Sequence, residues 1–375
     1  MTVDYLIKGG RVIDPYQNMD GIGDIAVKSG KIVDAHGTEA LETIDASGCI
    51  VTPGFIDFHT HLAAGLSDIG INGEAVYFSM GVTTAVDAGS AGTANYEAFR
   101  LCTMHGRLRI KAFLNVCPAG LATNAYHEYL DPTCFQKDTI LRYLEKYSDQ
   151  LLGLKLRTSR NIVGEYGMKP LEEALKIAAE ASRPLVVHTT NPPVKAEELV
   201  RVLRPGDIYA HVYHGTGEHI VREGKVVPEM YEHRRRGVIF DAANGTNHFS
   251  FDVASTCLAE GFTPDIISTD LTVKSLFKGR RVFSLPFVLS KYLALGLPLQ
   301  HIIRASTTAP AKLIGEEREL GSLCEGTCAD IAVHRIIKCK TQFEDSMQKV
   351  INSDSLLRTE MAMREGTVVF RQTGF

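Results

Sequence analysis

Hydrophobic and polar residues alternate over residues 1–52. The segments "DYLIKGGRVID" and "GDIAVKSGKIVDAHG" both follow this pattern, and Ser29–Gly30 supplies a turn inside the second. Alternation places apolar side chains on one face of a strand and polar side chains on the other. We therefore predict that the chain begins with short β-strands joined by turns.

The pattern changes after residue 54, where short apolar runs rich in β-branched residues recur up to residue 306. Between several of these runs the apolar residues follow a helical period, as in "KPLEEALKIAAEAS", where Pro170 suits the first turn of a helix. Short continuous apolar runs predict strands that are buried on both faces. The eight predicted strands are "GFIDFHTH", "GVTTAVDAG", "IKAFLNV", "LLGLKLRTS", "PLVVHTT", "DIYAHVYHG", "GVIFDAANG" and "DIISTDL".

Eight strands that alternate with helices over about 250 residues predict an α/β fold, specifically a (β/α)8 TIM barrel. Strand-like segments return after residue 310 as "ADIAVHRII" and, at the end of the chain, "GTVVFRQTGF". We predict that residues 1–52 and 310–375 pair into a small β-sandwich domain, beside a barrel domain of residues 53–309.

Polar side chains able to bind metals stand at the ends of the predicted barrel strands. His59 and His61 end the first strand, and residues two apart on a strand point to the same face. Neutral imidazole is a common ligand of zinc-like cations, although such a pair alone is weak evidence. The active site of a (β/α)8 barrel lies at the carboxyl ends of its strands. The residues that we expect to converge there are His59, His61, Lys155, His188, His211 and Asp270.

Lys155 is the most informative of these residues, because it is flanked by Leu152, Leu154 and Leu156. A buried ammonium group needs a partner or loses its proton. One interpretation is an ion pair with an inward-facing carboxylate. The other is a lysine that carbon dioxide has converted to a carbamate, which is an anionic oxygen ligand able to bridge two metals.

His211 and His214 are three residues apart, so on a strand they would face opposite ways. We choose His211 as the ligand because it lies within the predicted strand. His214 lies at the mouth of that strand, where it is either a substrate contact or a plain loop residue. The other histidines have no such placement and are expected to be structural or exposed, and His248, in "NGTNHF" after the seventh strand, is one of them.

Composition and charge indicate an ordinary packed protein, with 45% hydrophobic residues, 22% charged residues and a formal net charge of -4. This charge gives no general attraction to nucleic acid or to a membrane surface. No run reaches the roughly 18 apolar residues of a membrane span. The start of the chain has no charged leader before a long apolar core, so we predict a cytoplasmic protein whose eight scattered cysteines are free thiols.

The motif "PGFIDFHTH", the lysine of the fourth strand and the "STD" that ends at Asp270 resemble those of the amidohydrolase superfamily. Within it, the chain is most similar to the dihydroorotase-like branch with two metals, and there to an amidohydrolase/deacetylase subgroup. "ASTTAPAKLIG" at residues 305–315 and "GSLCEGTCADIAV" at residues 321–333 resemble the region where these proteins return from the barrel to the small sandwich. The resemblance covers nearly the whole chain.

The resemblance implies two divalent metal ions as cofactors, with zinc as the first expectation. His59 and His61 would hold the more buried ion, and His188 and His211 the more exposed one. A carbamylated Lys155 would bridge the two ions. Such a set of ligands also accepts manganese, cobalt or iron.

The resemblance also implies the reaction. A metal-bridging hydroxide would attack the acyl carbon, while Asp270 would bind the buried ion, take the proton and pass it to the leaving group. The expected substrate is a small carboxylate-bearing molecule with an amide or ester bond, such as an N-acyl amino acid or an O-acyl hydroxy acid. We expect no nucleic-acid or membrane partner, and a homo-oligomer is left open.

One departure from the family pattern narrows the substrate. Dihydroorotases resemble one another in an arginine two residues after the second histidine of the pair, and this chain has Ala63 there. Arg157 and Arg160 could grip a carboxylate instead, since an arginine fork matches its two oxygens, or could form loop-stabilising ion pairs. A cyclic amidohydrolase of the dihydroorotase kind is therefore an alternative that is weakened but not excluded.

Two further alternatives stay open. A one-metal nucleobase deaminase of the same superfamily would share the histidine pair, but it relies on a glutamate near the histidine of the fifth strand. No such glutamate stands beside His188, and a deaminase does not need Lys155. A non-catalytic interaction relative would have lost metal ligands, whereas this chain keeps all six candidates.

Overall fold

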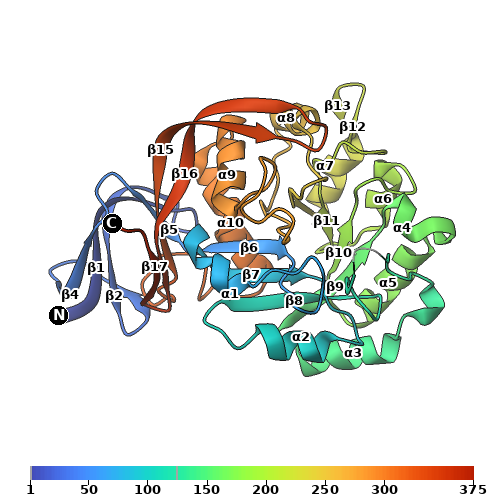
Figure 1. Cartoon of the computed structure of the whole chain (residues 1–375), viewed down its shortest axis with the longest axis horizontal. Helices are drawn as coiled ribbons and strands as arrows, with labels where there is room; N and C mark the ends of the chain where they lie inside the picture. Colours follow the sequence, from blue (N-terminus) through green and yellow to red (C-terminus); the bar gives the residue numbers. More distant parts are fainter. Residues whose placement is uncertain (1, 124–125) are drawn as a thin grey trace.

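The computed structural model describes residues 2–123 and 126–375 (Figure 1). Its centre is a sheet of seven parallel strands in the order β14-β11-β10-β9-β8-β7-β6, so that strands adjacent in the sheet follow one another along the chain. The strands are β6 (Phe55–Thr60), β7 (Val82–Ala88), β8 (Arg109–Asn115), β9 (Leu151–Arg157), β10 (Leu185–His188), β11 (Ile208–Ala210) and β14 (Ile239–Asp241).

These strands coincide with the first seven apolar runs of the sequence. Every residue of β6 and of β7 is buried, because one face of each strand points into the barrel and the other lies under helices. A strand covered on both faces carries few charged side chains, and those that it does carry, such as His59 in β6, need partners inside the protein. The inward-facing polar residues are therefore concentrated where the strands end.

Residues 266–271 complete the ring although they form no regular strand. Parallel bridges join Asp241 to Ile266 on one side and Thr60 to Leu271 on the other. The amide of Asp270 donates to the carbonyl oxygen of His59 at 2.7 Å, so this segment is bonded to β6 as a strand would be. The predicted (β/α)8 barrel is confirmed, with an eighth strand that is irregular and that contains Asp270 in a left-handed backbone conformation with φ of 52°.

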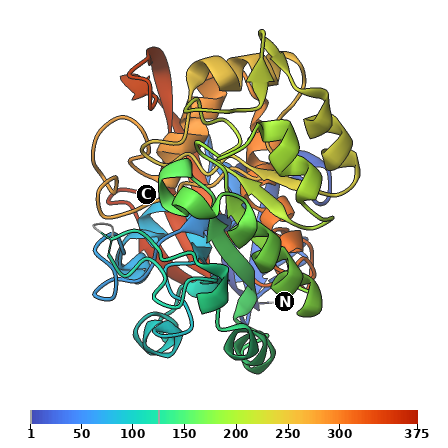
Figure 2. The same ribbon diagram turned by 90° about the vertical axis from the view of Figure 1, so that its right-hand side faces the viewer.

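Helices surround the strands (Figure 2). In α5 the predicted first-turn proline, Pro170, is in place, and Leu171, Ala174 and Ile177 form the buried stripe of the helix. Within residues 2–123 and 126–375, no helix is both long and apolar enough to cross a membrane. The α-helices are α1 (Gly73–Val76), α2 (Tyr96–Thr103), α3 (Lys137–Lys146), α4 (Arg160–Val163), α5 (Lys169–Glu180), α6 (Ala196–Val202), α7 (Pro228–Arg235), α8 (Phe251–Ala259), α9 (Leu285–Ala294), α10 (Leu299–Ser306) and α11 (Thr308–Leu313).

The two ends of the chain meet in a second sheet. Strand β5 pairs in parallel with β1 and antiparallel with β15, and so joins the first strands of the chain to the last ones. The two parts share one apolar core, to which Ile7, Val27 and Met361 contribute. The strands of this sheet are β1 (Thr2–Asp14), β2 (Met19–Lys28), β3 (Lys31–Val33), β4 (Glu39–Asp45), β5 (Ile50–Pro53), β15 (Ile331–Glu344), β16 (Val350–Arg364) and β17 (Thr367–Arg371). A separate short hairpin consists of β12 (Val221–Arg222) and β13 (Lys225–Val226).

Strands β15 and β16 form a long hairpin that leaves this sheet and runs over α9 towards α8 (Figure 1). Its tip is bonded to the barrel loop that follows β14. The hydroxyl group of Ser346 donates to the carbonyl oxygen of Phe249 at 2.7 Å, and the amide of Phe251 donates to Asp345 Oδ2 at 2.8 Å. The terminal sheet therefore helps to fix a loop at the end of the barrel that carries the strand ends.

Close packing between two barrel strands makes Gly153 a sensitive position. A Cβ atom at Gly153 in β9 would lie 2.1 Å from the carbonyl oxygen of Pro184, which is backbone and has little freedom to move. We expect Gly153→Ala to lower the free energy of unfolding by about 1–3 kcal/mol. Urea unfolding measures this loss. The control is Gly21→Ala in β2, where an added Cβ meets nothing within 4 Å. Equal unfolding midpoints for both variants would contradict the close approach.

Candidate metal centre

A pocket opens at the carboxyl ends of the barrel strands, where the sequence predicts the active site. Side chains from the ends of several strands and from the loops that follow them line it. The pocket-lining residues are His59, His61, Ile69, Asn115, Leu121, Lys155, Arg157, His188, Thr246, Asn247, His248, Asp270, Thr272 and Lys274. Five of the six residues expected to converge are among them, and the sixth, His211, is buried directly behind the pocket against His188 and His248.

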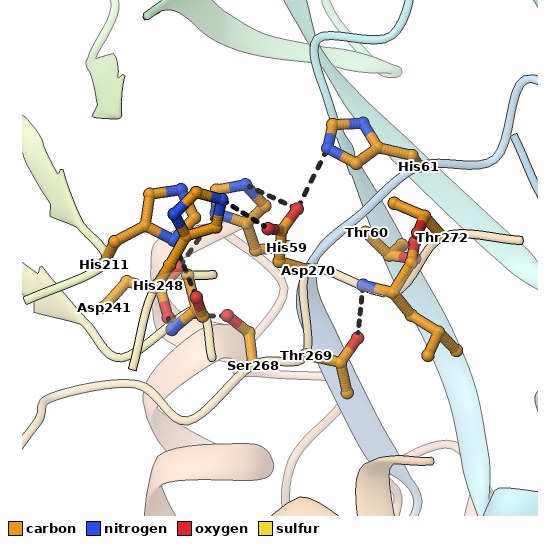
Figure 3. Close-up of polar contacts among 12 residues, drawn as sticks. His59, Thr60, His61, His211, Asp241, His248, Ser268, Thr269, Asp270 and Thr272 are labelled. Atoms are coloured by element: carbon orange, nitrogen blue, oxygen red, sulfur yellow. Dashed lines mark hydrogen bonds and ion pairs between the residues drawn. The ribbon is translucent and has the colours of Figure 1, made fainter. Parts of the chain in front are cut away.

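One group of metal-binding side chains consists of His59, His61 and Asp270, whose ligand atoms lie within 4.8 Å of one another. Nε2 of His61 is 3.1 Å from Oδ1 of Asp270, and Nε2 of His59 is 3.8 Å from the same oxygen (Figure 3). Two imidazole nitrogens and a carboxylate oxygen thus face a common point. Nitrogen and carboxylate oxygen are ligands that suit zinc and similar cations.

A second group consists of His188, His211 and His248, whose ligand atoms also lie within 4.8 Å of one another. The ring centroids of His188 and His211 are 4.2 Å apart. The His59 ring lies 5.1 Å from the His211 ring, so the two groups adjoin. Two adjacent sets of ligands of this kind are what a site for two cations requires.

Lys155 contacts the first group, and its charge also acts on His188 and His211 of the second group. Its Nζ is 3.1 Å from Nε2 of His59, and its side chain is buried. Burial lowers the pKa of Lys155 to about 8, although the charges of Asp270 and Asp241 favour its protonated form. Gly89 allows the lysine to lie this close, because a Cβ atom at residue 89 would lie 2.5 Å from Cβ of Lys155. An amine with a lowered pKa is more readily available in its neutral, nucleophilic form.

Partners on the far side of the rings fix the orientation of the histidines. Nδ1 of His59 donates to Oδ2 of Asp241 at 3.2 Å, and Asp241 in turn accepts from the Ser268 hydroxyl at 2.6 Å. Nδ1 of His61 lies 2.8 Å from Oγ of Ser90. These contacts engage the outer nitrogen of each ring and leave Nε2 pointing into the pocket, as in the outer hydrogen bonds of metal-binding histidines.

His211 is held in the same way, although it lies just past the end of β11 and not within the strand as the sequence predicted. Its Nδ1 donates to the carbonyl oxygen of Ala243 at 2.7 Å. The backbone of His211 turns into the left-handed region, with φ of 67°, and this turn aims the ring at the pocket. Nε2 of His211 is buried and has no hydrogen-bond partner in the structure. An unpartnered buried nitrogen costs free energy unless another group, such as a cation, occupies its lone pair.

The electrostatics of the site favour neutral rings. Burial lowers the pKa values of His59, His188 and His211 well below the usual range, and the neighbouring positive groups lower them further. Neutral imidazole is the form that binds metal. Neutral imidazoles, the orphaned nitrogen of His211 and the carboxylate of Asp270 together fit a pair of divalent cations.

The structure distributes the three predicted substrate contacts differently. Arg157 lines the pocket, but its guanidinium group is already bonded to Glu128, with Nε donating to Oε1 at 2.7 Å and Nη2 to Oε2 at 2.5 Å. Arg160 is not among the residues that line the pocket, and its Nη2 donates to the carbonyl oxygen of Pro193 at 3.3 Å. His214 is buried away from the pocket, where its ring lies near that of His219. The contacts of Arg157 therefore favour the ion-pair interpretation over that of a substrate contact.

The pair between Arg157 and Glu128 gives a stability prediction. Glu128→Gln leaves the partly buried guanidinium group without its anion, so we expect the free energy of unfolding to fall by about 3–5 kcal/mol. The double variant Glu128→Gln/Arg157→Met removes both charges and should recover much of this loss. Urea unfolding of the wild type and of both variants measures it. A stable Glu128→Gln variant would instead leave Arg157 free to contact a substrate.

Sequence reasoning missed His248, which lies in the second group of ligands, and the outer partners Asp241 and Ser90. It also missed Thr190, whose Oγ1 lies 2.9 Å from Nδ1 of His248. His248 follows β14 by seven residues, within a loop rather than at a strand end. The one signal for it is its position, because every loop that follows a barrel strand faces the same pocket. Asp241 ends the seventh strand, and its inward direction could have been inferred from the same rule.

Comparison with known proteins gives consistent results. The sequence profile of the amidohydrolase family matches residues 42–109. The chain is 35% identical over 308 residues to a deacetylase of Agrobacterium fabrum. This alignment covers 81% of this chain and 75% of that protein. It is 30% identical over 344 residues to a deacetylase of Enterococcus faecalis, which covers 90% of each chain.

Two crystal structures resemble the fold closely. One, described as an adenine deaminase, has a TM-score of 0.89 and 27% sequence identity, and the match covers 98% of this chain and 99% of that one. The other, described as a dihydroorotase, has a TM-score of 0.87 and 31% identity, and the match covers 98% and 97%. Both similarities extend over the barrel and the terminal sheet together.

Proposed function

Because the chain belongs to the amidohydrolase superfamily, and is a hydrolase of carbon–nitrogen bonds, we propose that it removes an acyl group from a small carboxylate-bearing substrate. The bond would be the amide of an N-acyl amino acid or the ester of an O-acyl hydroxy acid. The proposed cofactors are two divalent cations, with zinc as the first choice, and a carbamate on Lys155.

The observation that carries this proposal is the position of Lys155, whose Nζ contacts His59 of one set of metal-binding side chains and whose charge acts on His188 and His211 of the other. In the proposed arrangement His59, His61 and Asp270 hold one cation, and His188 and His211 hold the other. The neutral amine of Lys155 would attack carbon dioxide and lose a proton, which turns the side chain into an anionic oxygen ligand for both cations. A carbamate is an anion, so this change replaces a buried positive charge beside two cations with a negative charge.

The chemistry divides between the cations and the protein. The bound cations would lower the pKa of a water molecule and polarise the acyl carbonyl group. Asp270 would accept a proton from the attacking water at its carboxylate and deliver it to the nitrogen or oxygen of the leaving group as the acyl bond breaks. The products are a carboxylic acid and a free amine or alcohol. The hydrogen bonds of His59 and His61 to Asp241 and Ser90 hold these rings in position throughout.

The charges around the pocket support a substrate with a carboxylate group. Lys274 lines the pocket, is exposed, and forms no ion pair in the described parts of the chain. Arg157 also lines the pocket, but its fork is bonded to Glu128. We propose that Lys274, rather than Arg157 or Arg160, attracts the substrate carboxylate. Thr272 is close by in the chain and offers a hydroxyl group to the same pocket.

The similarity to a structure described as a dihydroorotase favours a second candidate, the opening of a cyclic amide. Two deacetylases resemble the chain at comparable identity over most of its length. Ala63 stands where dihydroorotases carry an arginine, and it is buried, so it leaves no group there to bind a carboxylate. We therefore rank deacylation first.

A screen that assays carboxylic acid released from the acylated substrates and formed from dihydroorotate, and ammonia released from adenine, tests the proposal. The wild-type protein is loaded with zinc in bicarbonate buffer and offered N-acetyl amino acids of both hands, O-acetyl hydroxy acids, dihydroorotate and adenine. Asp270→Asn, treated identically, is the blank. We expect turnover of an acetylated acid by the wild type alone. Turnover of dihydroorotate or adenine but of no acetylated acid would overturn the deacylase assignment.

A further inference from the structure

His248 is a fifth histidine in the metal centre, and the six ligands of the proposed function do not include it. Its ring centroid lies 4.7 Å from that of His188 and 4.4 Å from that of His211. All three residues offer ligand atoms within 4.8 Å of one another. His248 is therefore about as close to His188 and His211 as those two histidines are to each other.

The inner nitrogen of His248 forms no hydrogen bond within the described parts of the chain. Nε2 lies 3.7 Å from Oδ2 of Asp270, which is too long for a hydrogen bond (Figure 3). The outer nitrogen is engaged, since Nδ1 lies 2.9 Å from Oγ1 of Thr190. His59, His61 and His211 have the same arrangement, with a polar partner at Nδ1 and with Nε2 directed inwards. A proton on Nδ1 leaves the lone pair of Nε2 free for a cation.

The backbone brings His248 close to the centre. Gly245 has φ of 53°, and a Cβ atom there would lie 2.5 Å from both Oδ2 of Asp270 and Cδ2 of His248. The amide of Gly245 also donates to the carbonyl oxygen of Thr269 at 2.9 Å. The loop can therefore pass directly over Asp270 only because residue 245 has no side chain.

The loop is fixed on its other side by the long hairpin of the terminal sheet. The residue after His248, Phe249, accepts hydrogen bonds from both the amide and the hydroxyl group of Ser346, at 2.9 and 2.7 Å. The ring of His248 is thus held by Thr190 at its outer nitrogen and by Ser346 through the neighbouring residue. Pre-positioning of this kind lowers the entropic cost of binding a ligand.

From this arrangement we propose that His248 is a third nitrogen ligand of the cation held by His188 and His211. The inference rests on the proposed function, because it concerns one of the two cations that this function requires. It adds that this cation has three histidine ligands besides the shared carbamate. Such a cation is retained more firmly than one with two histidines, and it leaves fewer open positions for substrate.

Cobalt binding to the full chain tests this inference. The protein is stripped of metal by a chelator, supplied with bicarbonate and titrated with Co²⁺, with calorimetry and visible absorption as readouts. His248→Phe keeps an aromatic ring between the neighbouring rings but removes the nitrogen, and His248→Gln is a second variant should the first fail to fold. Asn247→Ala, the adjacent pocket-lining residue, is the matched control. Thr190→Val removes only the partner of Nδ1.

We expect two Co²⁺ ions in the wild type and in Asn247→Ala. In His248→Phe one of them should bind at least about tenfold more weakly, with an altered absorption spectrum, and Thr190→Val should show a smaller loss. Unchanged affinities and spectra in both His248 variants would overturn the inference. A folded wild-type protein that binds no Co²⁺ would instead refute the proposed function itself.

Discussion

Lys155→Met is expected to lower kcat by about a thousandfold or more and to release at least one of the two cations. The methionine side chain fills a similar volume, but it cannot form a carbamate, so the shared anionic ligand of the two cations is lost. Removing a group that holds the reacting cations costs several kcal/mol of transition-state stabilisation, and each 1.36 kcal/mol is a factor of ten in rate. Steady-state kinetics and elemental analysis of the purified variant measure both effects.

Lys291→Met is the matched control for this substitution. Lys291 is the other fully buried lysine of the described chain, and its Nζ donates to the carbonyl oxygen of Arg281 at 2.6 Å, outside the pocket lining. Loss of Lys291 should lower stability but leave both cations bound. If Lys155→Met retained two cations and wild-type turnover, Lys155 would be a buried amine with no part in the metal centre.

Asp270→Asn is expected to lower kcat by about 10²–10⁴-fold, because an amide cannot accept the proton that the reaction must move. The substitution should not strain the backbone. Asp270 has φ of 52°, and asparagine is among the few residues that tolerate the left-handed region. Thermal unfolding should therefore show a folded variant, and kinetics with the best substrate of the screen should show the loss.

The control for Asp270→Asn changes a carboxylate of the same type elsewhere. Asp252→Asn alters an exposed carboxylate in α8 that pairs with Lys349 at the surface. We expect it to keep wild-type turnover, since a surface ion pair contributes little. Wild-type activity in Asp270→Asn would assign the proton transfer to another group and would remove Asp270 from the proposed reaction.

The barrel could be predicted from the sequence because its strands are buried on both faces. In a chain that also carries helical periodicity, continuous apolar runs such as the one that contains β7 are typical of parallel strands under helices. Strand β16 was not predicted, although its outer half alternates between exposed and partly buried residues. Its partner in the hairpin, β15, was predicted only over its first half, in the segment "ADIAVHRII". Polar residues dominate the exposed halves of both strands, and a periodicity of two is weak where neither face is strongly apolar.

The convergence of His59, Lys155 and Asp270 could be predicted because a parallel barrel places all strand ends on one side. Two other features depend on loops, whose course the sequence does not specify. The partner of Arg157 is Glu128, from the connection between β8 and β9, 29 residues earlier in the chain. His248 enters the site because Gly245 lets the loop cross over Asp270. Neither contact follows from strand or helix periodicity.

His211 illustrates a prediction that succeeded for an incomplete reason. The alternation of a strand favours it over His214, and the structure does bring His211 to the centre and leave His214 outside. Strand β11 nevertheless ends at Ala210, so the direction of the ring comes from the left-handed turn at His211 itself. A backbone turn of this kind in a residue with a Cβ atom has no reliable signal in a single sequence.

The most direct test of the proposed metal centre is X-ray diffraction from crystals of zinc-loaded protein grown in bicarbonate, with data collected at the zinc absorption edge. We predict two anomalous peaks, one between His59, His61 and Asp270 and the other beside His188 and His211. Electron density for a carbamate should extend from Nζ of Lys155 towards both peaks. A single peak, or none, together with an unmodified Lys155 amine would contradict the assignment of this chain as a hydrolase with two cations.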